Sequence, residues 1–406
     1  MGKPKIRFKG YQEDWEQRKL GDFGKATGGT SIESEFSEDG IYKVISIGSY
    51  SENGVYNDQG IRAIKSDKTS NRVLNRNDLT MILNDKTTSG NIIGRVLLIE
   101  ESGIYVYNQR TERIEINLDE YDPVFLYEML NAPNIREKII KQAQGNTQIY
   151  VNWIAISLLE YMIPSKEEQV KIGEYLHSIS NLITLHQRKC EEMKTLKKYM
   201  LQKMFPQNGQ LVPQIRFSGF TEDWEQRKLG ELVAIYDGVH QTPDYQDSGI
   251  MFLSVENIAT LKSEKYISEE AFERDYKVYP EKGDILMTRI GDVGTTNVVE
   301  TAEKVAFYVS LALLKPNGID SYFLSNAMKT NAFQKGLRER TLVTAIPQKI
   351  NKDEIGKINI FITNNDEEQK KIGAYFSNLD HLITLHQQKC DELRNIKKFM
   401  LQNMFI

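Results

Sequence analysis

The chain has 406 residues, ordinary fractions of apolar, charged and aromatic residues, and a formal net charge of −4 at pH 7. This length is sufficient for two or three domains of a globular protein. No apolar run approaches the ~18 residues of a membrane span, and the N-terminal stretch lacks the apolar core of a signal peptide, so we expect a cytoplasmic protein without membrane contact.

Two segments with nearly the same sequence open the two halves of the chain. Residues 4–22 read PKIRFKGYQEDWEQRKLGD and residues 213–231 read PQIRFSGFTEDWEQRKLGE, with 14 of 19 positions identical. We expect Trp15 and Trp224 to anchor these segments as buried apolar side chains. The chain is therefore a repeat, with copies at about 4–205 and 213–405 and a short loop-like linker at 206–212.

Each opening segment is followed by a long block of mixed α and β character, at 23–164 and 232–364. In the first block we predict β-rich stretches at 41–50, 79–83, 92–100 and 104–117, a helical stretch at 123–144 interrupted at Ala132-Pro133, and a last element at 153–163. In the second we predict β-rich stretches at 251–255, 284–288, 297–299 and 305–314, a helical stretch at 320–337 and a strand at 357–363. The elements correspond but the residues mostly differ, as expected of two similar domains that recognise different things.

The most similar stretches are residues 167–205 and 367–405, which are identical at 23 of 39 positions. Apolar residues recur in both at steps of mostly three and four, and the stripe includes Leu182 and Leu196. Ser165 and Asn365 each precede a glutamate by three residues, which is typical of a helix start. Each stretch therefore predicts one helix of roughly 58 Å, at about 1.5 Å per residue.

A helix this long with one apolar stripe needs a packing partner. The two copies could pair as an antiparallel coiled coil within the chain, or each could pack separately on its own domain. The matched stripes favour the pair. Cys190 and Cys390 occupy the same position in the two copies, where we expect small buried hydrophobes in a reducing compartment and no disulfide.

The acidic net charge alone does not suggest nucleic acid, but the cations are unevenly distributed. Residues 62–76, residues 329–352 and the last half of the first long helix are rich in Lys and Arg. The default explanation of any one such run is a solvated surface.

Motifs of catalysis are missing from the sequence. It contains no GxxxxGK[ST] or HExxH motif and no cysteine pair at metal-binding spacing. Asp122-Pro123-Val124-Phe125 is a weak match to the [ND]PP[YF] loop of amino-methyltransferases, because the second proline is absent. The chain is therefore predicted to bind and not to catalyse, without a cofactor or metal of its own.

The arrangement of two variable blocks, each followed by a long repeated helix, resembles the DNA-specificity (S) subunit of type I restriction-modification enzymes. The residues that carry the resemblance are the EDWEQRKLG segments, the helix starts at Glu-Glu-Gln, and Gly283-Asp284-Ile285-Leu286, which matches the family's GDIL pattern. Repeat one departs from that pattern with Asn77-Asp78-Leu79-Thr80, so we expect its equivalent turn to differ.

The resemblance implies an α+β fold with two pseudo-repeated mixed α/β target-recognition domains, separated by two long helices that form an antiparallel coiled coil. The corresponding boundaries are 1–164 and 213–364 for the domains, 165–205 and 365–406 for the helices, and 206–212 for the linker. It implies a non-catalytic subunit that binds double-stranded DNA, each domain contacting one half of a split target. The partners would be two methyltransferase (M) subunits that bind S-adenosylmethionine and restriction (R) subunits that use ATP and Mg.

Base recognition needs polar side chains that project from loops or helix ends into a groove. The candidates lie after the helical stretch of each block and in a few further loops. They are Gln109, Arg110, Asn146 and Gln148 in the first block, and His240, Gln241, Thr242, Tyr245, Arg289, Arg338, Arg340 and Thr341 in the second. Each could equally be an ordinary exposed loop residue.

Two alternatives remain at this point. The chain could be a non-catalytic scaffold whose paired domains bind proteins, or an enzyme with an unrecognised site. A scaffold would gain little from two similar domains with unlike surfaces, and the enzyme lacks any acid–base or metal constellation.

Overall fold

The computed structural model describes residues 3–207 and 209–406. Met1 and Gly2 of the predicted first domain and Asn208 of the predicted linker lie outside the described residues. The chain forms two compact units. Unit 1 comprises Met1–Gln187 with Gln388–Ile406, and unit 2 comprises Arg188–Gln387, so each unit takes one part of both long helices.

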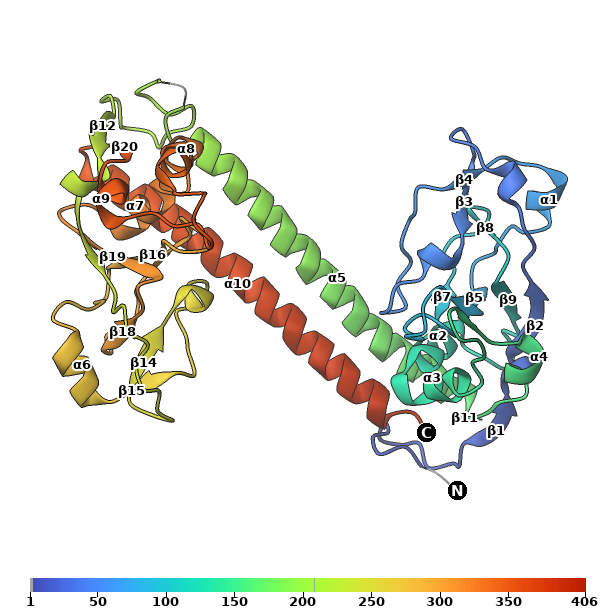
Figure 1. The fold of residues 1–406 in the computed structure, drawn as a ribbon. Coiled ribbons are helices and arrows are strands. Elements are labelled where there is room, and N and C mark those ends of the chain that lie inside the picture. The colour runs from blue at the N-terminus through green and yellow to red at the C-terminus, as the bar shows by residue number, and fades with distance from the viewer. Residues whose placement is uncertain (1–2, 208) are drawn as a thin grey trace. The chain divides into compact units, whose positions relative to one another are not determined.

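Unit 1 contains a four-stranded antiparallel sheet and a three-stranded sheet with one parallel pair (Figure 1). The first has the order β2 (Gly24–Gly28), β9 (Thr111–Ile116), β5 (Leu79–Ile82), β7 (Val96–Leu98), and the second β4 (Arg62–Ala63), β3 (Tyr42–Ile45), β8 (Tyr105–Tyr107). Strand β5 is buried along its whole length, because Leu79 and Met81 pack into one core cluster and Ile82 packs into another.

Unit 2 repeats this topology. Its four-stranded sheet has the order β13 (Val233–Asp237), β19 (Leu311–Pro316), β16 (Ile285–Thr288), β17 (Thr296–Val298), and its three-stranded sheet β15 (Tyr266–Ile267), β14 (Ile250–Leu253), β18 (Val305–Phe307). The pairing directions match those of unit 1 strand by strand. The predicted fold class, two pseudo-repeated mixed α/β domains with two long helices, is confirmed.

Two consecutive helices follow the sheet strands in each unit. They are α2 (Pro123–Asn131) and α3 (Pro133–Ile140) in unit 1, and α7 (Ser321–Ala327) and α8 (Asn331–Arg340) in unit 2. The predicted interruption at Ala132-Pro133 is confirmed, since Ala132 is extended between the two helices. Asp122 and Asp320 cap the first helix of each pair.

The remaining elements are short. They are α1 (Asp67–Ser70), α4 (Trp153–Ile156), α6 (Glu269–Asp275) and α9 (Lys352–Gly356), the paired strands β6 (Asn84–Asp85) and β10 (Ile149–Tyr150), and the 3-10 turns η1 (Leu20–Phe23), η2 (Glu33–Glu35), η3 (Ile47–Ser49), η4 (Leu229–Glu231) and η5 (Val255–Asn257).

The opening segments hold the start of each long helix. Strand β1 (Glu16–Lys19) pairs with β11 (Glu160–Ile163), and β12 (Glu225–Lys228) pairs with β20 (Asn359–Ile362). Trp15 and Trp224 are buried, as predicted. In unit 1, Arg7 donates two hydrogen bonds of 2.8 Å to Glu168, whose side chain is completely buried. Unit 2 repeats this bidentate pair with Arg216 and Glu368.

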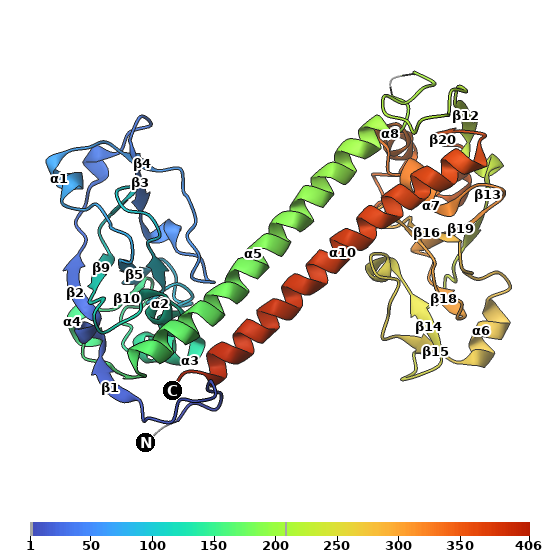
Figure 2. The same ribbon diagram turned by 180° about the vertical axis from the view of Figure 1, so that it is seen from behind.

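Helices α5 (Lys166–Lys203) and α10 (Asp366–Asn403) lie side by side and run in opposite directions in both views (Figures 1 and 2). In unit 2 the Cys190 thiol contacts the Ile383 carbonyl at 3.9 Å, and in unit 1 the Cys390 thiol contacts the Ile183 carbonyl at 3.7 Å. Both cysteines are buried, as predicted.

The predicted apolar stripe includes positions that the structure exposes. Positions 172, 176, 179, 183, 186, 190, 193, 197 and 200 of α5 are all buried or half-buried, and they alternate in steps of four and three. This spacing is the narrow seam of a coiled coil, and it admits the polar His186 and Lys197. Leu182 and Leu196 fall off the seam and are 43% and 40% exposed.

The tip of each long helix is buried in a unit. Phe405 packs on Phe125 in unit 1, while Phe205 packs on Trp224 and Phe323 in unit 2. The second repeat therefore completes the core of unit 1, and the first repeat completes the core of unit 2. None of the helices within the described ranges is long and apolar enough to cross a membrane.

The expected difference between the turns before β5 and β16 is not found. Asn77 adopts a φ of 73° and Gly283 a φ of 95°, so both are left-handed. Asp78 and Asp284 then accept a hydrogen bond from the backbone three residues earlier, at Asn75 and Glu281. Asparagine tolerates this conformation better than most residues other than glycine, so the two sequences form the same turn.

Candidate nucleic-acid interface

Several loops of unit 2 meet at one end of the four-stranded sheet. The Val309 amide donates to Val239, the Arg289 amide to Ser310, and the Ile350 amide to Arg289, at 2.9, 2.9 and 3.0 Å. These bonds bring the loops after β13, after β18 and after β16 beside the segment after α8. That segment closes on itself through a bridge between Leu342 and Lys349, and we refer to it as loop 342–349.

The same end of the sheet in unit 1 is built in the same way. The Leu83 amide donates to Arg110 and the Val151 amide to Leu83, both at 2.9 Å. Strand β6 pairs with β10, and a bridge between Gln144 and Tyr150 closes the segment after α3. This segment, loop 144–150, occupies the place that loop 342–349 has in unit 2.

The unit 1 candidates lie at this end of the sheet. Arg110, Asn146 and Gln148 are exposed, and loop 144–150 presents consecutive polar residues from Gly145 to Gln148. Gln109 is half-buried and donates to Glu33 at 3.2 Å, so its amide is partly occupied. Arg110 stands at a φ of 68°, which turns the chain sharply between β8 and β9.

Most unit 2 candidates are also accessible. His240, Gln241 and Thr242 follow Val239 and are exposed, and Arg338 is exposed in the last turn of α8. Arg340 is half-buried and donates to the Gly336 carbonyl of its own helix at 3.3 Å. Thr341 bonds to the Leu337 carbonyl at 2.8 Å.

Tyr245 and Arg289 are held by neighbours. Tyr245 is 46% exposed, contacts Phe252 edge-on, and lies under the Lys265 ammonium. Arg289 is only 7% exposed, and its guanidinium pairs with Asp237. Burial lowers the pKa of Arg289. The structure therefore places Arg289 behind the surface, where it joins loop 342–349 to the sheet through its backbone.

A further polar loop, which the sequence patterns did not single out, lies beside loop 144–150. Lys86, Thr87, Thr88 and Ser89 are exposed immediately after β6, which pairs with β10. A run of polar residues shortly after a buried strand is visible in the sequence and is sufficient to predict an exposed loop there. Lys349 was noticed only as part of a basic run, yet it closes loop 342–349.

One buried carboxyl lies at the unit 1 sheet end. Glu112 of β9 is opposite Gly28 and Met81, and its side chain is 5% exposed. Burial raises the pKa of Glu112 to about 7, against the opposing effect of Arg72. The register places Ala312 opposite Met287 at the matching position of unit 2, so this titratable group belongs to unit 1 alone.

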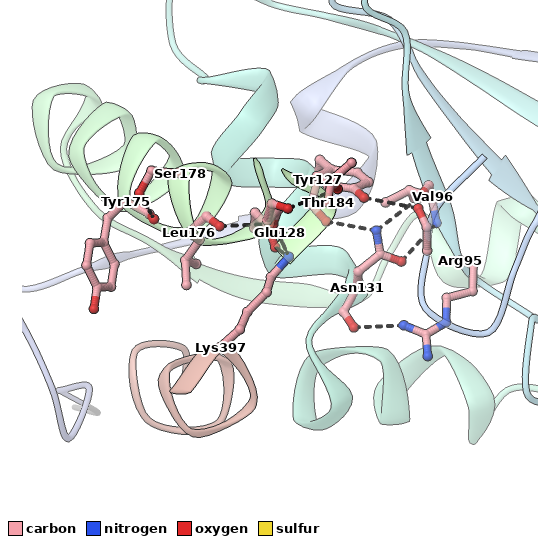
Figure 3. A network of polar contacts seen from close by, with 12 residues as sticks. Arg95, Val96, Tyr127, Glu128, Asn131, Tyr175, Leu176, Ser178, Thr184 and Lys397 are labelled. Atoms are coloured by element: carbon pink, nitrogen blue, oxygen red, sulfur yellow. Dashed lines mark hydrogen bonds and ion pairs between the residues drawn. The ribbon is translucent and has the colours of Figure 1, made fainter. Parts of the chain in front are cut away.

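A buried ion pair attaches helix α2 of unit 1 to the long helices (Figure 3). Glu128 of α2, 1% exposed, accepts hydrogen bonds from Lys397 of α10 at 2.9 Å and from Ser180 of α5 at 3.3 Å. Asn131, on the same helix, bonds the Val96 carbonyl at 3.0 Å and accepts from Arg95 at its backbone. Helix α2 is thereby fixed to β7 on one side and to both long helices on the other.

Unit 2 has a related ion pair at the equivalent lysine, but its carboxylate comes from a different element. Lys197 of α5 bonds both carboxylate oxygens of Asp380 on α10, at 2.5 and 2.6 Å. Burial and the charge of Lys197 lower the pKa of the neighbouring Lys329 to about 8, while Asp380 opposes this shift. The carboxylate of this pair therefore belongs to the long helix α10, whereas in unit 1 it belongs to the short helix α2.

Other hollows are poor candidates for DNA. A hollow of about 340 Å³ in unit 1 is lined by four carboxylates, Glu13, Asp14, Glu16 and Glu120, against two cations, Arg18 and Lys166, and the excess of negative charge repels phosphate. Within residues 3–207 and 209–406, no three His, Cys, Asp or Glu side chains could hold a metal ion together.

Comparison with known proteins gives consistent matches. The profile of the type I restriction modification DNA specificity domain matches residues 12–195 and 221–395. The MjaVIII type I restriction enzyme specificity subunit of Methanocaldococcus jannaschii is 23% identical over 407 residues, covering 95% of this chain and 91% of that protein. The putative MjaX specificity subunit of the same organism is 23% identical over 330 residues, covering 75% of this chain and 73% of that protein.

Solved structures share the fold. The crystal structure of a type I restriction-modification S subunit from M. genitalium has a TM-score of 0.72 at 18% identity, with 100% of this chain and 99% of that chain covered. A chain from a structural study of complex assembly and conformational transition in a type I restriction-modification system has a TM-score of 0.52 at 16% identity, covering 97% and 98%.

Proposed function

Since this chain belongs to the type I restriction modification DNA specificity family, as the non-catalytic specificity subunit of such a system, we propose that its two units bind the two halves of one split DNA target. The observation that carries the proposal is the pair of sheet ends. Both have the same strand order and the same loop positions, but the exposed side chains of the two loops differ: loop 144–150 exposes Asn146, Thr147 and Gln148, whereas loop 342–349 exposes Leu342, Val343, Ile346 and Lys349 as well as Thr344 and Gln348. Different side chains on equal supports are what two unlike half-sites require.

The contacting residues are proposed from exposure and position. In unit 1 these are Arg110, Asn146 and Gln148, to which we add Lys86; in unit 2 they are His240, Gln241, Thr242, Arg338, Arg340 and Thr341. Amide and guanidinium groups suit base edges, whereas lysines suit phosphates. Gln109 and Tyr245 are proposed at the margin of the interface, and Arg289 as a support of it.

Helices α5 and α10 are proposed to set the gap between the half-sites, because bound half-site spacing follows protein geometry in other bipartite readers. The narrow seam allows a clean test. Deleting residues 184–190 and 384–390 removes one heptad from each helix and keeps the alternation of the seam. The helices become shorter by about 10 Å, so the preferred gap should change or binding should be lost. An unchanged gap would contradict this role.

The M subunits are proposed to dock on apolar residues that the seam leaves exposed. Leu182, Leu185 and Phe399 are exposed in unit 1, while Leu382, Leu385, Leu196 and Tyr199 are exposed in unit 2. Exposed patches of this kind mark interaction sites. Three positions of the two sets are equivalent in the repeat (182 and 382, 185 and 385, 399 and 199), so they suit two copies of one partner, while Leu196 has only the half-buried Ile396 as its counterpart. S-adenosylmethionine would be bound by the M subunits, ATP and Mg by the R subunits, and the complex would act on DNA in the cytoplasm.

The decisive experiment is a methylation map. The chain is expressed with its M subunits in a host without other modification, and the genome is sequenced for N6-methyladenine. A single motif of two short halves around a fixed gap is expected, and exchange of residues 23–164 should change one half only. Arg340→Ala should weaken or relax one half while the other is unchanged. If the M subunits neither co-purify nor methylate, the alternative of a non-catalytic scaffold that binds proteins is favoured.

A further inference from the structure

Loop 342–349 of unit 2 presents apolar side chains to solvent. Ile346 is 100% exposed, Val343 69% and Leu342 46%. Isolated exposed hydrophobic residues are common on protein surfaces, but three within five residues form a cluster that indicates a binding site. Loop 144–150 of unit 1, at the matching place, presents Asn146, Thr147 and Gln148 instead.

The loop is tied to the sheet end by its backbone. The Leu342 amide donates to Lys349 at 2.8 Å, and the Gly291 amide donates to Gln348 at 2.9 Å. The Gln348 side chain returns a bond of 3.0 Å to the Gly291 carbonyl. The exposed residues Val343 and Ile346 are therefore carried on a closed, anchored loop and project from it.

Cations flank this apolar cluster along the chain. Between residues 335 and 352 there are five, Lys335, Arg338, Arg340, Lys349 and Lys352, against one carboxylate, Glu339, and Asp353 and Glu354 follow directly. None of the five forms an ion pair within the part of the chain that the structure describes. The cores of protein–protein interfaces are depleted of charge, whereas protein–DNA interfaces are positively charged. The surroundings of the loop therefore fit DNA better than an apolar protein surface.

Resting on the proposed function, we propose that Val343 and Ile346 recognise a thymine of the second half-site by apolar contact with its 5-methyl group. In the major groove thymine alone presents a methyl group, and a small apolar side chain distinguishes it by contact. The flanking cations would hold the adjacent phosphates. The two units then differ in the type of recognition, since loop 144–150 exposes no aliphatic side chain, whereas loop 342–349 exposes three beside its polar Thr344 and Gln348.

Uracil tests the proposal, because it differs from thymine only by the methyl group. The full chain in complex with its M subunits is titrated with duplexes that carry the mapped motif, at constant salt. Each thymine of both half-sites is replaced by uracil in turn. At one or two positions of the half-site that unit 2 binds, affinity should fall by about fourfold, the effect of one buried methyl group.

The variant Ile346→Ala with Val343→Ala should bind the thymine duplex more weakly and lose its sensitivity to uracil. Ile154→Ala is the matched control, because Ile154 is a 75% exposed isoleucine of unit 1 outside loop 144–150, and it should keep the full uracil effect. Two results would overturn the proposal. Either no uracil in that half-site matters, or the double variant weakens thymine and uracil duplexes equally, as an intercalating wedge would. If the unaltered complex shows no motif-specific binding at all, the result contradicts the proposed function itself.

Discussion

The two units hold the long helices with the same lysine and a different acid. Lys397 in unit 1 and Lys197 in unit 2 occupy the same position of the repeated helix. Lys397 pairs with Glu128 of the recognition domain, next to Ser180, whereas Lys197 pairs with Asp380 of the neighbouring helix. Ser180 and Asp380 are themselves equivalent positions, and Asn326 stands six residues after the capping aspartate, where Glu128 stands in unit 1.

The difference shows that the half-buried lysine needs one carboxylate beside it in each unit. The element that supplies this carboxylate can change. A buried lysine without a carboxylate is costly, and two carboxylates on one lysine repel. A recognition domain and the first half of the helix that follows it therefore belong together as a set. By contrast, the Arg7–Glu168 and Arg216–Glu368 pairs are alike in both units.

The largest loss of stability is expected from the arginine–glutamate pairs that both units contain. Arg7→Ala leaves Glu168 completely buried without its bidentate partner, and Arg216→Ala removes the same partner from Glu368, which keeps a hydrogen bond from the Thr363 hydroxyl. Each change should lower the free energy of unfolding of its own unit by about 3–5 kcal/mol, with the smaller loss in unit 2. Hydrogen exchange of each unit, measured by mass spectrometry, checks this. A loss below about 1 kcal/mol in either unit would contradict the prediction for that pair.

Removing the carboxylate beside the repeated lysine should cost unit 1 more stability than unit 2. Glu128→Gln leaves Lys397, whose side chain is 20% exposed, without a carboxylate, and should destabilise unit 1 by about 3 kcal/mol. Asp380 is 46% exposed, so Asp380→Asn should cost unit 2 only about 1 kcal/mol. The same exchange measurement applies to both.

A double change sharpens this comparison by giving unit 1 the arrangement of unit 2. Glu128→Asn with Ser180→Asp restores one carboxylate beside Lys397 from the long helix, and should recover most of the loss. Ser180→Asp alone places two carboxylates at one lysine and should destabilise. If the double variant is no better than Glu128→Gln, the charge cannot be moved between elements.

Much of this architecture could be predicted from the sequence, because repetition and periodicity are properties of the sequence itself. The paired helices, the interruption at Ala132-Pro133 and the buried tryptophans follow from such patterns. Strands β1 and β12 could not, since the residues EQRK show no apolar alternation and pair through their backbones. Glu128 looked like an ordinary helix residue, because its partner lies 269 positions away.

The sequence predicted candidate contact residues after the helical stretch of each block and in a few further loops. The structure shows that Arg110, Asn146 and Gln148 are exposed, and their contact with DNA stays a prediction. Arg289 was chosen for its type, but burial and Asp237 occupy its guanidinium, which only tertiary contacts reveal. The apolar cluster on loop 342–349 was overlooked because base recognition was sought among polar residues alone.

A smaller effect should make unit 1 sensitive to pH. Because burial raises the pKa of Glu112 to about 7, the folded state holds its proton more tightly than the unfolded state. The resulting stability is complete below the ordinary carboxyl pKa and is lost as the pH rises through 7. Unit 1 should therefore lose about 1–3 kcal/mol relative to Glu112→Gln between pH 4.5 and pH 7.5. Unit 2, with Ala312 at that position, is the internal control in the same hydrogen-exchange series.

The smallest effect concerns the shared left-handed turn. Glycine adopts a positive φ without steric cost, and asparagine adopts it at a small one. Asn77→Gly should therefore change the stability of unit 1 by less than about 0.5 kcal/mol, and Gly283→Asn should cost unit 2 about 0.5–1 kcal/mol. A Cβ at Gly283 would meet only the Ser321 hydroxyl, at 3.9 Å, so crowding adds little. Replacement of either residue by valine, which resists positive φ, should cost clearly more. If Gly283→Asn were as damaging as Gly283→Val, the two turns would not be interchangeable, although their φ angles agree.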